Sequence, residues 1–148
     1  AAMQWRDVGK SPETLVDAKL AVDMAPLGRQ IAFVCNQPGS FLDWATATTV
    51  ATDVPASVAD MTALIAATRA RLAAFDGDDA LLAREKIVSL PGDLAITFTG
   101  ATYIDDWILP NFYFHLVTAY AILRSQGVVI GKADYMAHLA AQVRPRTA

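Results

Sequence analysis

The chain has 148 residues, of which 54% are hydrophobic and 18% charged, so it is not a disordered polypeptide and can form a sizeable core. Its formal net charge is −3, and without a basic excess to neutralise phosphates it is not expected to bind nucleic acid. We expect one domain over residues 1–148. A single cysteine and the lack of a signal-peptide pattern predict a cytoplasmic protein.

The first predicted helix begins at Ser11-Pro12-Glu13, which combines a serine N-cap, a proline at the first helical position and an acid in the first turn. We expect this helix to end near Met24. A second helix is predicted from Pro26, because apolar residues repeat on one face over 27–35. Pro38-Gly39 interrupts this pattern and predicts either one kinked helix or two helices in series.

A third helix is predicted after a short linker, because Ser57 is followed by Asp60 at the spacing of a helix-capping pair. Arg69 and Arg71 lie off its apolar stripe, so this segment is the most clearly amphipathic helix in the chain. The repeating apolar positions are Val58, Met61, Leu64, Ile65, Leu72 and Phe75.

After this helix the sequence pattern changes from helical to β-rich. Two β-rich runs, 87–90 and 95–99, flank the turn residues Pro91-Gly92-Asp93 and predict a small β-hairpin. A short segment around Lys132 to Leu139 is predicted near the C-terminus, before a polar tail.

A long helix is predicted from about Thr102 to Ser125, with Gly127 at its C-terminal cap. The longest apolar stretch of the chain, 107–123, lies within it and falls short of the roughly 20 apolar residues of a membrane span. We therefore expect a buried core helix and no membrane partner. The polar or helix-breaking residues of this stretch include Pro110, Asn111, His115 and Thr118.

The string at 109–115 (LPNFYFH), continued by TAYAILR at 118–124, resembles the signature helix of the DUF1993 family. The family belongs to the DinB/YfiT-like superfamily, so the resemblance implies a mainly α four-helix bundle, here with a small β-hairpin before the last long helix. Better-known members bind a divalent metal through three histidines, and some act as thiol-dependent transferases or isomerases. Other landmarks follow in the family's order: Ala21–Met24 with Gln30, Phe98–Gly100 with Tyr103, and Gly131-Lys132 with Asp134-Tyr135.

The chain departs from the family pattern in two places. Family members begin with an additional helix of about 20 residues or more, and only its last turn corresponds to Ala1–Val8. If the chain is complete, we expect the groove left by that helix to recruit a partner helix. In helix two, the family's Cys-Asp-His string corresponds to Cys35-Asn36-Gln37, so amides replace the acid and the histidine.

These departures bear on metal binding. The chain has only His115 and His138, and we expect His138 to be a surface residue. The metal-binding relatives carry a further histidine where Ala119 stands, and helix two offers at most Gln37. One imidazole and neutral amides bind zinc or nickel too weakly, so we expect no tightly bound metal or other cofactor.

Two interpretations of the polar residues stay open. Asn111 and His115 can form a hydrogen-bonded buried pair, with the carbonyl freed by Pro110 as one partner. Alternatively, a small pocket between helices two and four binds a ligand, at the position of the superfamily's site. Its predicted lining is Asn36, Gln37, Asn111, His115 and Thr118.

Two functions follow from these interpretations. The first is a metal-free helical module that binds a small apolar ligand or forms a homodimer through its alanine-rich helix faces. The alternative is an enzyme of the thiol-dependent transferase or isomerase type, with His115 as a general base and the amides orienting the substrate. We expect Cys35 to be a small core residue in either case.

Overall fold

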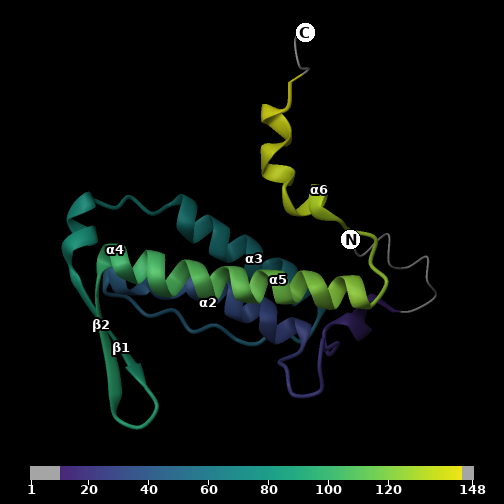
Figure 1. Cartoon of the computed structure of the whole chain (residues 1–148), viewed down its shortest axis with the longest axis horizontal. Coiled ribbons are helices and arrows are strands. Elements are labelled where there is room, and N and C mark those ends of the chain that lie inside the picture. Colours follow the sequence, from purple (N-terminus) through teal and green to yellow (C-terminus); the bar gives the residue numbers. More distant parts are fainter. Residues whose placement is uncertain (1–10, 145–148) are drawn as a thin grey trace.

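The structure is a computed structural model and describes residues 11–144. Figure 1 shows a mainly helical fold from which a two-stranded sheet projects at one end. The long helices of this part of the chain are α2 (Leu27–Thr46), α3 (Val58–Ala73) and α5 (Leu109–Ser125). The predicted mainly α class with a hairpin before the last long helix is confirmed. Ala1–Val8, where the last turn of a first helix was expected, lies outside the described residues.

The predicted helix from Ser11 to Met24 is wrong in its length. Ser11 does cap a helical turn, but this is a 3₁₀ helix that spans only Pro12–Leu15. The chain leaves the helix because its next carbonyls bond across space to the start of α2. The N–H of Gly28 donates to the oxygen of Val16, and the N–H of Leu27 donates to the oxygen of Ala18, both over 2.9 Å.

Helix α2 runs through Pro38 as one continuous helix, which decides between the two alternatives that the sequence left open. It ends where Ala47 adopts a left-handed conformation with φ of 53°. A segment over residues 47–57 then returns along the length of the bundle (Figure 1).

Helix α3 begins as predicted, since the N–H of Asp60 donates to Oγ of Ser57 over 3.0 Å. It runs parallel to α2, because Pro55 contacts the start of α2 at Gly28 while Arg71 pairs with Asp43 near its end. The Arg71 Nη2 atom lies 2.7 Å from Oδ1 of that aspartate. The parallel arrangement explains why the chain needs a long connection between these two helices.

The predicted hairpin is confirmed as strands β1 (Glu85–Leu90) and β2 (Leu94–Thr99). They pair antiparallel, with Glu85 opposite Thr99 and Leu90 opposite Leu94. Gly92 and Asp93 in the turn have φ of 75° and 60°, the left-handed region that glycine and aspartate tolerate best.

The last long helix contains a wide π-helical segment, Tyr103–Ile108, between α4 (Gly100–Thr102) and α5. The segment directly precedes Pro110, whose ring and missing N–H are incompatible with an undisturbed α-helix. Gly127, with φ of 85°, follows the end of α5 as predicted. No helix within residues 11–144 is both long and apolar enough to cross a membrane.

Helix α5 runs antiparallel to α2, since the ring of Tyr103 lies 5.7 Å from that of Trp44 at one end of the pair. The principal hydrophobic core lies at the other end, where α2 begins and α5 finishes. Ile122 is completely buried there. The core consists of Leu15, Val16, Leu27, Met61, Ala119, Ile122 and Val128.

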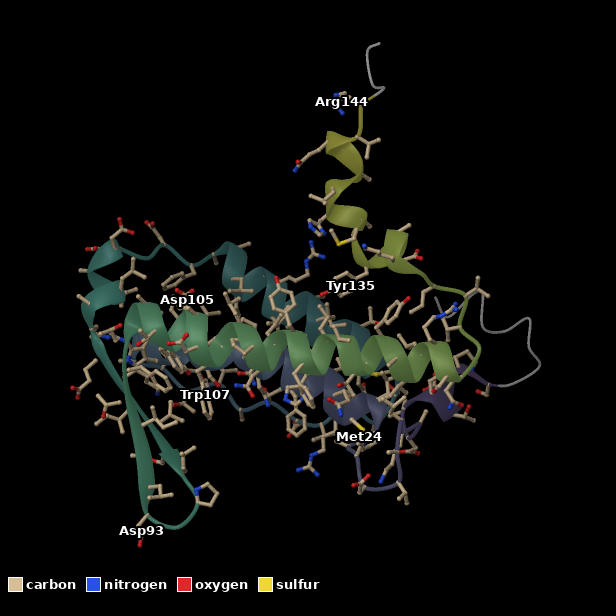
Figure 2. All side chains as sticks on the ribbon, in the orientation of Figure 1. Met24, Asp93, Asp105, Trp107, Tyr135 and Arg144 are labelled. Carbon is tan, nitrogen blue, oxygen red and sulfur yellow. The ribbon has the colours of Figure 1, made fainter. Side chains whose placement is uncertain are left out.

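The C-terminal arm of the described chain, residues 131–144, projects away from the bundle (Figure 1). It holds the short helix α6 (Lys132–Tyr135) and a 3₁₀ helix, Ala137–Gln142. The ring of Tyr135 lies 6.4 Å from that of Tyr120 on α5, close to the point where the arm leaves the body (Figure 2). His138 is exposed on this arm, as predicted.

Candidate functional site

A polar pair lies between α2 and α5. Nδ1 of His115 is 2.8 Å from Oε1 of Gln30, a residue 85 positions away in the sequence. The Gln30 side chain is only 2% exposed. Its Nε2 atom donates to the carbonyl oxygen of Ala25 over 3.2 Å, just before α2 begins. That bond orients the amide with its oxygen toward the imidazole.

The geometry of this pair determines where the imidazole carries its proton. An amide oxygen can only accept a hydrogen bond, so Nδ1 of His115 must be the donor. Burial lowers the pKa of His115 below its usual 6.5, which keeps the ring neutral at pH 7. In the neutral ring the lone pair is then on Nε2.

Two aromatic rings lie close to the imidazole of His115. The Phe33 ring centroid is 4.7 Å away and tilted by 40°, and the Phe114 ring is 5.2 Å away and meets the imidazole edge-on. Within residues 11–144, no protein group hydrogen-bonds Nε2, and no buried side-chain nitrogen or oxygen lacks a partner. Nε2 is therefore accessible as a hydrogen-bond acceptor. The ring that carries it is half-buried and lies among apolar side chains.

The other polar residues predicted on α5 bond within their own helix. Nδ2 of Asn111 donates to the carbonyl oxygen of Trp107, and the hydroxyl of Thr118 donates to that of Phe114, each over 2.7 Å. The expected partner, the carbonyl freed by Pro110, lies one residue earlier than the one observed. Asn111 and His115 are thus satisfied separately and not by each other.

The amide of α2 that bonds to His115 is Gln30, whereas Gln37 was predicted as the contribution of this helix. Asn36 and Gln37 are half-buried in the same helix, and Gln37 follows Gln30 by two helical turns on the same face. The antiparallel pairing of α2 and α5 brings residue 37 level with the residues near 109. Two signals pointed to Gln30: its place among the family landmarks, and its being the first amide on an apolar stripe of α2.

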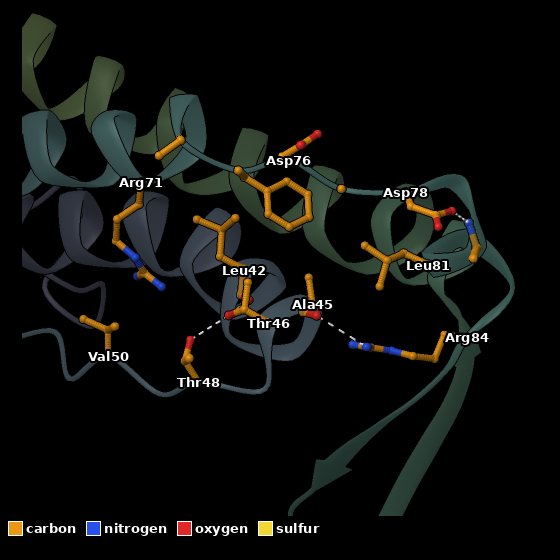
Figure 3. A pocket seen from close by; sticks show the side chains of 14 residues that line it. Leu42, Ala45, Thr46, Thr48, Val50, Arg71, Asp76, Asp78, Leu81 and Arg84 are labelled. Atoms are coloured by element: carbon orange, nitrogen blue, oxygen red, sulfur yellow. Dashed lines mark hydrogen bonds between the residues drawn. The ribbon is translucent and has the colours of Figure 1, made fainter.

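An open hollow lies at the opposite end of the bundle from the core (Figure 3). It has a volume of about 1000 Å³ and is formed by the ends of α2 and α3 and the segment after α3. None of the five predicted ligand-binding residues lines this hollow. Its larger lining side chains are those of Leu42, Val50, Arg71, Phe75, Leu81 and Arg84.

Both arginines of the hollow have structural partners. Arg71 forms the ion pair with Asp43, and Arg84 donates to the carbonyl oxygen of Trp44 at the end of α2. Arg84 also donates to the carbonyl oxygen of Ala45 (Figure 3). The Arg84 guanidinium also lies 4.1 Å above the Trp44 ring. A cation that binds the last carbonyls of a helix stabilises it, so the charge of Arg84 supports the fold.

A family model described as "Domain of unknown function (DUF1993)" matches residues 1–136. The protein belongs to the DUF1993 family. A crystal structure of a DinB family member protein from Shewanella denitrificans is similar to it, with a TM-score of 0.78 and 28% sequence identity. That match covers 99% of this chain and 83% of the Shewanella chain. No curated protein matches the sequence.

The DinB-like fold implies a divalent metal held by three histidines, and the described residues of this DUF1993 protein do not fit one. No group of three or more His, Cys, Asp or Glu side chains converges anywhere in residues 11–144. Oε1 of Gln30 already accepts from His115, and the Thr118 hydroxyl donates within its own helix. Only Nε2 of His115 is then left as a metal ligand at this point of the fold, and one neutral nitrogen is too few to hold a divalent metal tightly.

Cys35 is the cysteine of this DUF1993 chain, and its side chain is only 5% exposed in α2. Burial raises the pKa of its thiol, and a hydrogen bond with Thr68 of α3 opposes the rise to a smaller extent. A buried thiol with a raised pKa is a poor nucleophile at neutral pH. The prediction that Cys35 is a small core residue is confirmed.

Proposed function

We propose that this protein is a metal-free helical module that binds a small apolar ligand carrying one hydrogen-bond donor, with His115 as its polar contact. The observation that carries the proposal is the buried Gln30 amide, which fixes the proton of His115 on Nδ1 and leaves Nε2 as an acceptor. A DUF1993 chain with a DinB-like fold provides the scaffold. A cytoplasmic location fits the free cysteine and stays a prediction.

The surroundings of Nε2 define the ligand class. Phe33 and Phe114 offer aromatic surface, which favours a planar apolar ligand, and a single acceptor selects for one O–H or N–H group. Asn111 contributes an amide whose oxygen is an additional acceptor, one turn before His115. In this proposal Asn36, Gln37 and Thr118 complete the lining between α2 and α5.

The alternative is an enzyme of the thiol-dependent transferase or isomerase type in which His115 removes a proton from the substrate. Its support is the same free lone pair on Nε2. The burial that lowers the pKa of His115 also disfavours the imidazolium that such a step would form. The site therefore favours hydrogen-bond acceptance over proton abstraction, and binding is the function that the geometry supports best.

A pair of matched probes tests the binding proposal. Phenol and toluene have nearly the same shape, but only phenol can donate to Nε2. Phenol is expected to raise the Tm of the wild-type protein more than toluene does, and this difference should disappear in His115→Phe. Equal shifts from both probes in the wild-type protein would contradict the proposal, as would an unchanged difference in His115→Phe.

Metal analysis separates binding from the metalloenzyme expected for the superfamily. We expect the purified protein to contain less than stoichiometric metal by mass spectrometry and to show little change of Tm with nickel or zinc. A stoichiometric metal, or a large stabilisation by either ion that His115→Phe abolishes, would exclude the metal-free module.

A further inference from the structure

The open hollow beside the ends of α2 and α3 has a largely apolar lining. Its volume of about 1000 Å³ is that of a site for a small molecule. Leu42 is buried in this lining, and Phe75 and Leu81 are half-buried in it. They belong to α2, to the segment after α3 and to the 3₁₀ helix Asp79–Ala83, so separate parts of the chain build the hollow together.

Arg84 brings a positive charge to this lining, and the fold holds its guanidinium in place. The group donates to the carbonyl oxygens of Trp44 and Ala45 and lies 4.1 Å above the Trp44 ring. A guanidinium has five N–H donors, so these two bonds leave others that a ligand can use. Because the side chain is already positioned, a ligand does not have to order it on binding.

Of the two cations that line the hollow, Arg84 is the one without a counter-ion within residues 11–144. Arg71 forms its ion pair with Asp43, whereas Arg84 forms none. The Asp78 carboxylate accepts a backbone N–H two residues along the chain over 2.6 Å. Figure 3 shows the Asp76 side chain turned away from the other lining side chains. Neither lining carboxylate therefore neutralises Arg84.

We propose that the hollow binds a small molecule with an apolar body and a single carboxylate, and that Arg84 binds this carboxylate. The planar guanidinium matches a carboxylate, which can accept two of its N–H groups at once. One cation without a counter-ion balances one negative charge, so a monocarboxylate fits better than a dianion such as a phosphate monoester. Leu42, Phe75 and Leu81 then cover the apolar body of the ligand.

This carboxylate site is separate from the proposed site around His115. The hollow lies against the last turn of α2, whereas Gln30, which bonds to His115, is in the first turn of that helix. Neither residue lines the hollow. The two sites can therefore succeed or fail separately, and His115→Phe should leave carboxylate binding unchanged.

Octanoate and octan-1-ol are a matched pair of probes, because they share a chain length and only octanoate is charged at pH 7.5. In ¹H–¹⁵N spectra octanoate should shift the backbone signals of residues 45–50 and 74–81. It should bind roughly tenfold more tightly than the alcohol, as a charge-assisted hydrogen bond gives. Arg84→Gln should remove most of this difference, and Arg84→Lys should keep part of it through its charge.

A second pair of variants tests the hollow without changing Arg84. Ala74 lines the hollow and is exposed, so Ala74→Phe should occupy space that the ligand needs and remove most of the octanoate-induced shifts. Ala73→Phe is the matched control, since Ala73 is exposed but does not line the hollow, and it should bind octanoate as the wild type does. This pair decides the question even where Arg84→Gln weakens the fold.

Three results would overturn the proposal. The first is equal affinity of the wild-type protein for octanoate and octan-1-ol, which would mean that no charge is recognised. The second is octanoate binding that Ala74→Phe leaves unchanged. The third is a set of octanoate-induced shifts confined to the residues around His115, which would assign the ligand to the other site.

Discussion

Nδ1 of His115 lies 2.8 Å from Oε1 of Gln30, and this contact joins the two helices that pack most extensively in the bundle. A glutamine that is 2% exposed loses its hydration on folding, so both ends of its amide need partners. The amide nitrogen of Gln30 donates to the carbonyl oxygen of Ala25, and its amide oxygen accepts from Nδ1 of His115. One buried side chain thereby determines the proton position of another 85 residues away.

Replacing Gln30 with glutamate should raise the pKa of His115. A carboxylate in the same place accepts from Nδ1 as the amide oxygen does, and it also stabilises the imidazolium by its negative charge. The ¹H–¹³C spectrum of the His115 ring, followed from pH 4 to 9, measures this pKa directly. Gln37→Glu, two turns further along α2, is the matched control and should produce a smaller rise. A pKa in Gln30→Glu at or below the wild-type value would contradict the assignment.

The stability of the protein should depend on His115 at mildly acidic pH. Because burial lowers its pKa in the folded state, the unfolded chain binds a proton more readily between its usual 6.5 and the lower folded value. The stabilisation is therefore complete above pH 6.5 and declines as the pH falls through this window. Urea unfolding at several pH values should show a steeper loss for the wild type than for His115→Gln. Parallel curves for the two proteins would show that His115 is not buried as described.

Gly28 should be intolerant of a side chain. A Cβ there would lie 2.8 Å from the carbonyl oxygen of Pro55 and 3.0 Å from Cγ1 of Val16, so backbone would have to move. We expect Gly28→Ala to lower the free energy of unfolding by about 1–3 kcal/mol. Gly131→Ala is the control, since no atom lies within 4 Å of its added Cβ. Equal stabilities for the two variants in urea would contradict the packing of residues 16 and 55 against α2.

Cys35 should react slowly with thiol reagents until the protein unfolds. Its side chain is buried and burial raises its pKa, so little thiolate is exposed at pH 8. Reaction with Ellman's reagent is expected to be slow in buffer and fast in 6 M guanidinium chloride. Leu42→Ala, which opens a cavity two turns further along α2, should accelerate the native reaction by increasing local opening. Rapid labelling of the native wild-type protein would place Cys35 outside the core.

The elements that could be predicted from the sequence are those whose boundaries depend on adjacent residues. Ser57 and Asp60 cap α3, and Pro91-Gly92-Asp93 forms the hairpin turn, through bonds within a few positions of each other. The segment from Ser11 was predicted too long because its carbonyls bond to Leu27 and Gly28, which no local pattern reveals. Local propensity was overridden there by contacts between distant parts of the chain.

The site could be predicted only in part, because one of its two residues is marked by its local pattern and the other is brought to it by packing between helices. His115 stands out as an isolated polar residue in an apolar helix, and the structure gives it a buried partner. Gln30 belongs to another helix, and only the antiparallel packing of α2 and α5 brings the two together. The lining roles of Asn36 and Gln37 stay predictions, since their types suggest polar contacts but their spacing alone does not select a partner.

The position of the imidazole proton tests the proposed function most directly. Long-range ¹H–¹⁵N spectra of the wild-type protein at pH 7.5 distinguish the protonated ring nitrogen from the unprotonated one. The geometry predicts a neutral ring with hydrogen on Nδ1 and the lone pair on Nε2, and Gln30→Leu should remove this preference. A neutral His115 that carries its hydrogen on Nε2 would mean that the ring offers a ligand no acceptor, and would contradict the proposed binding site.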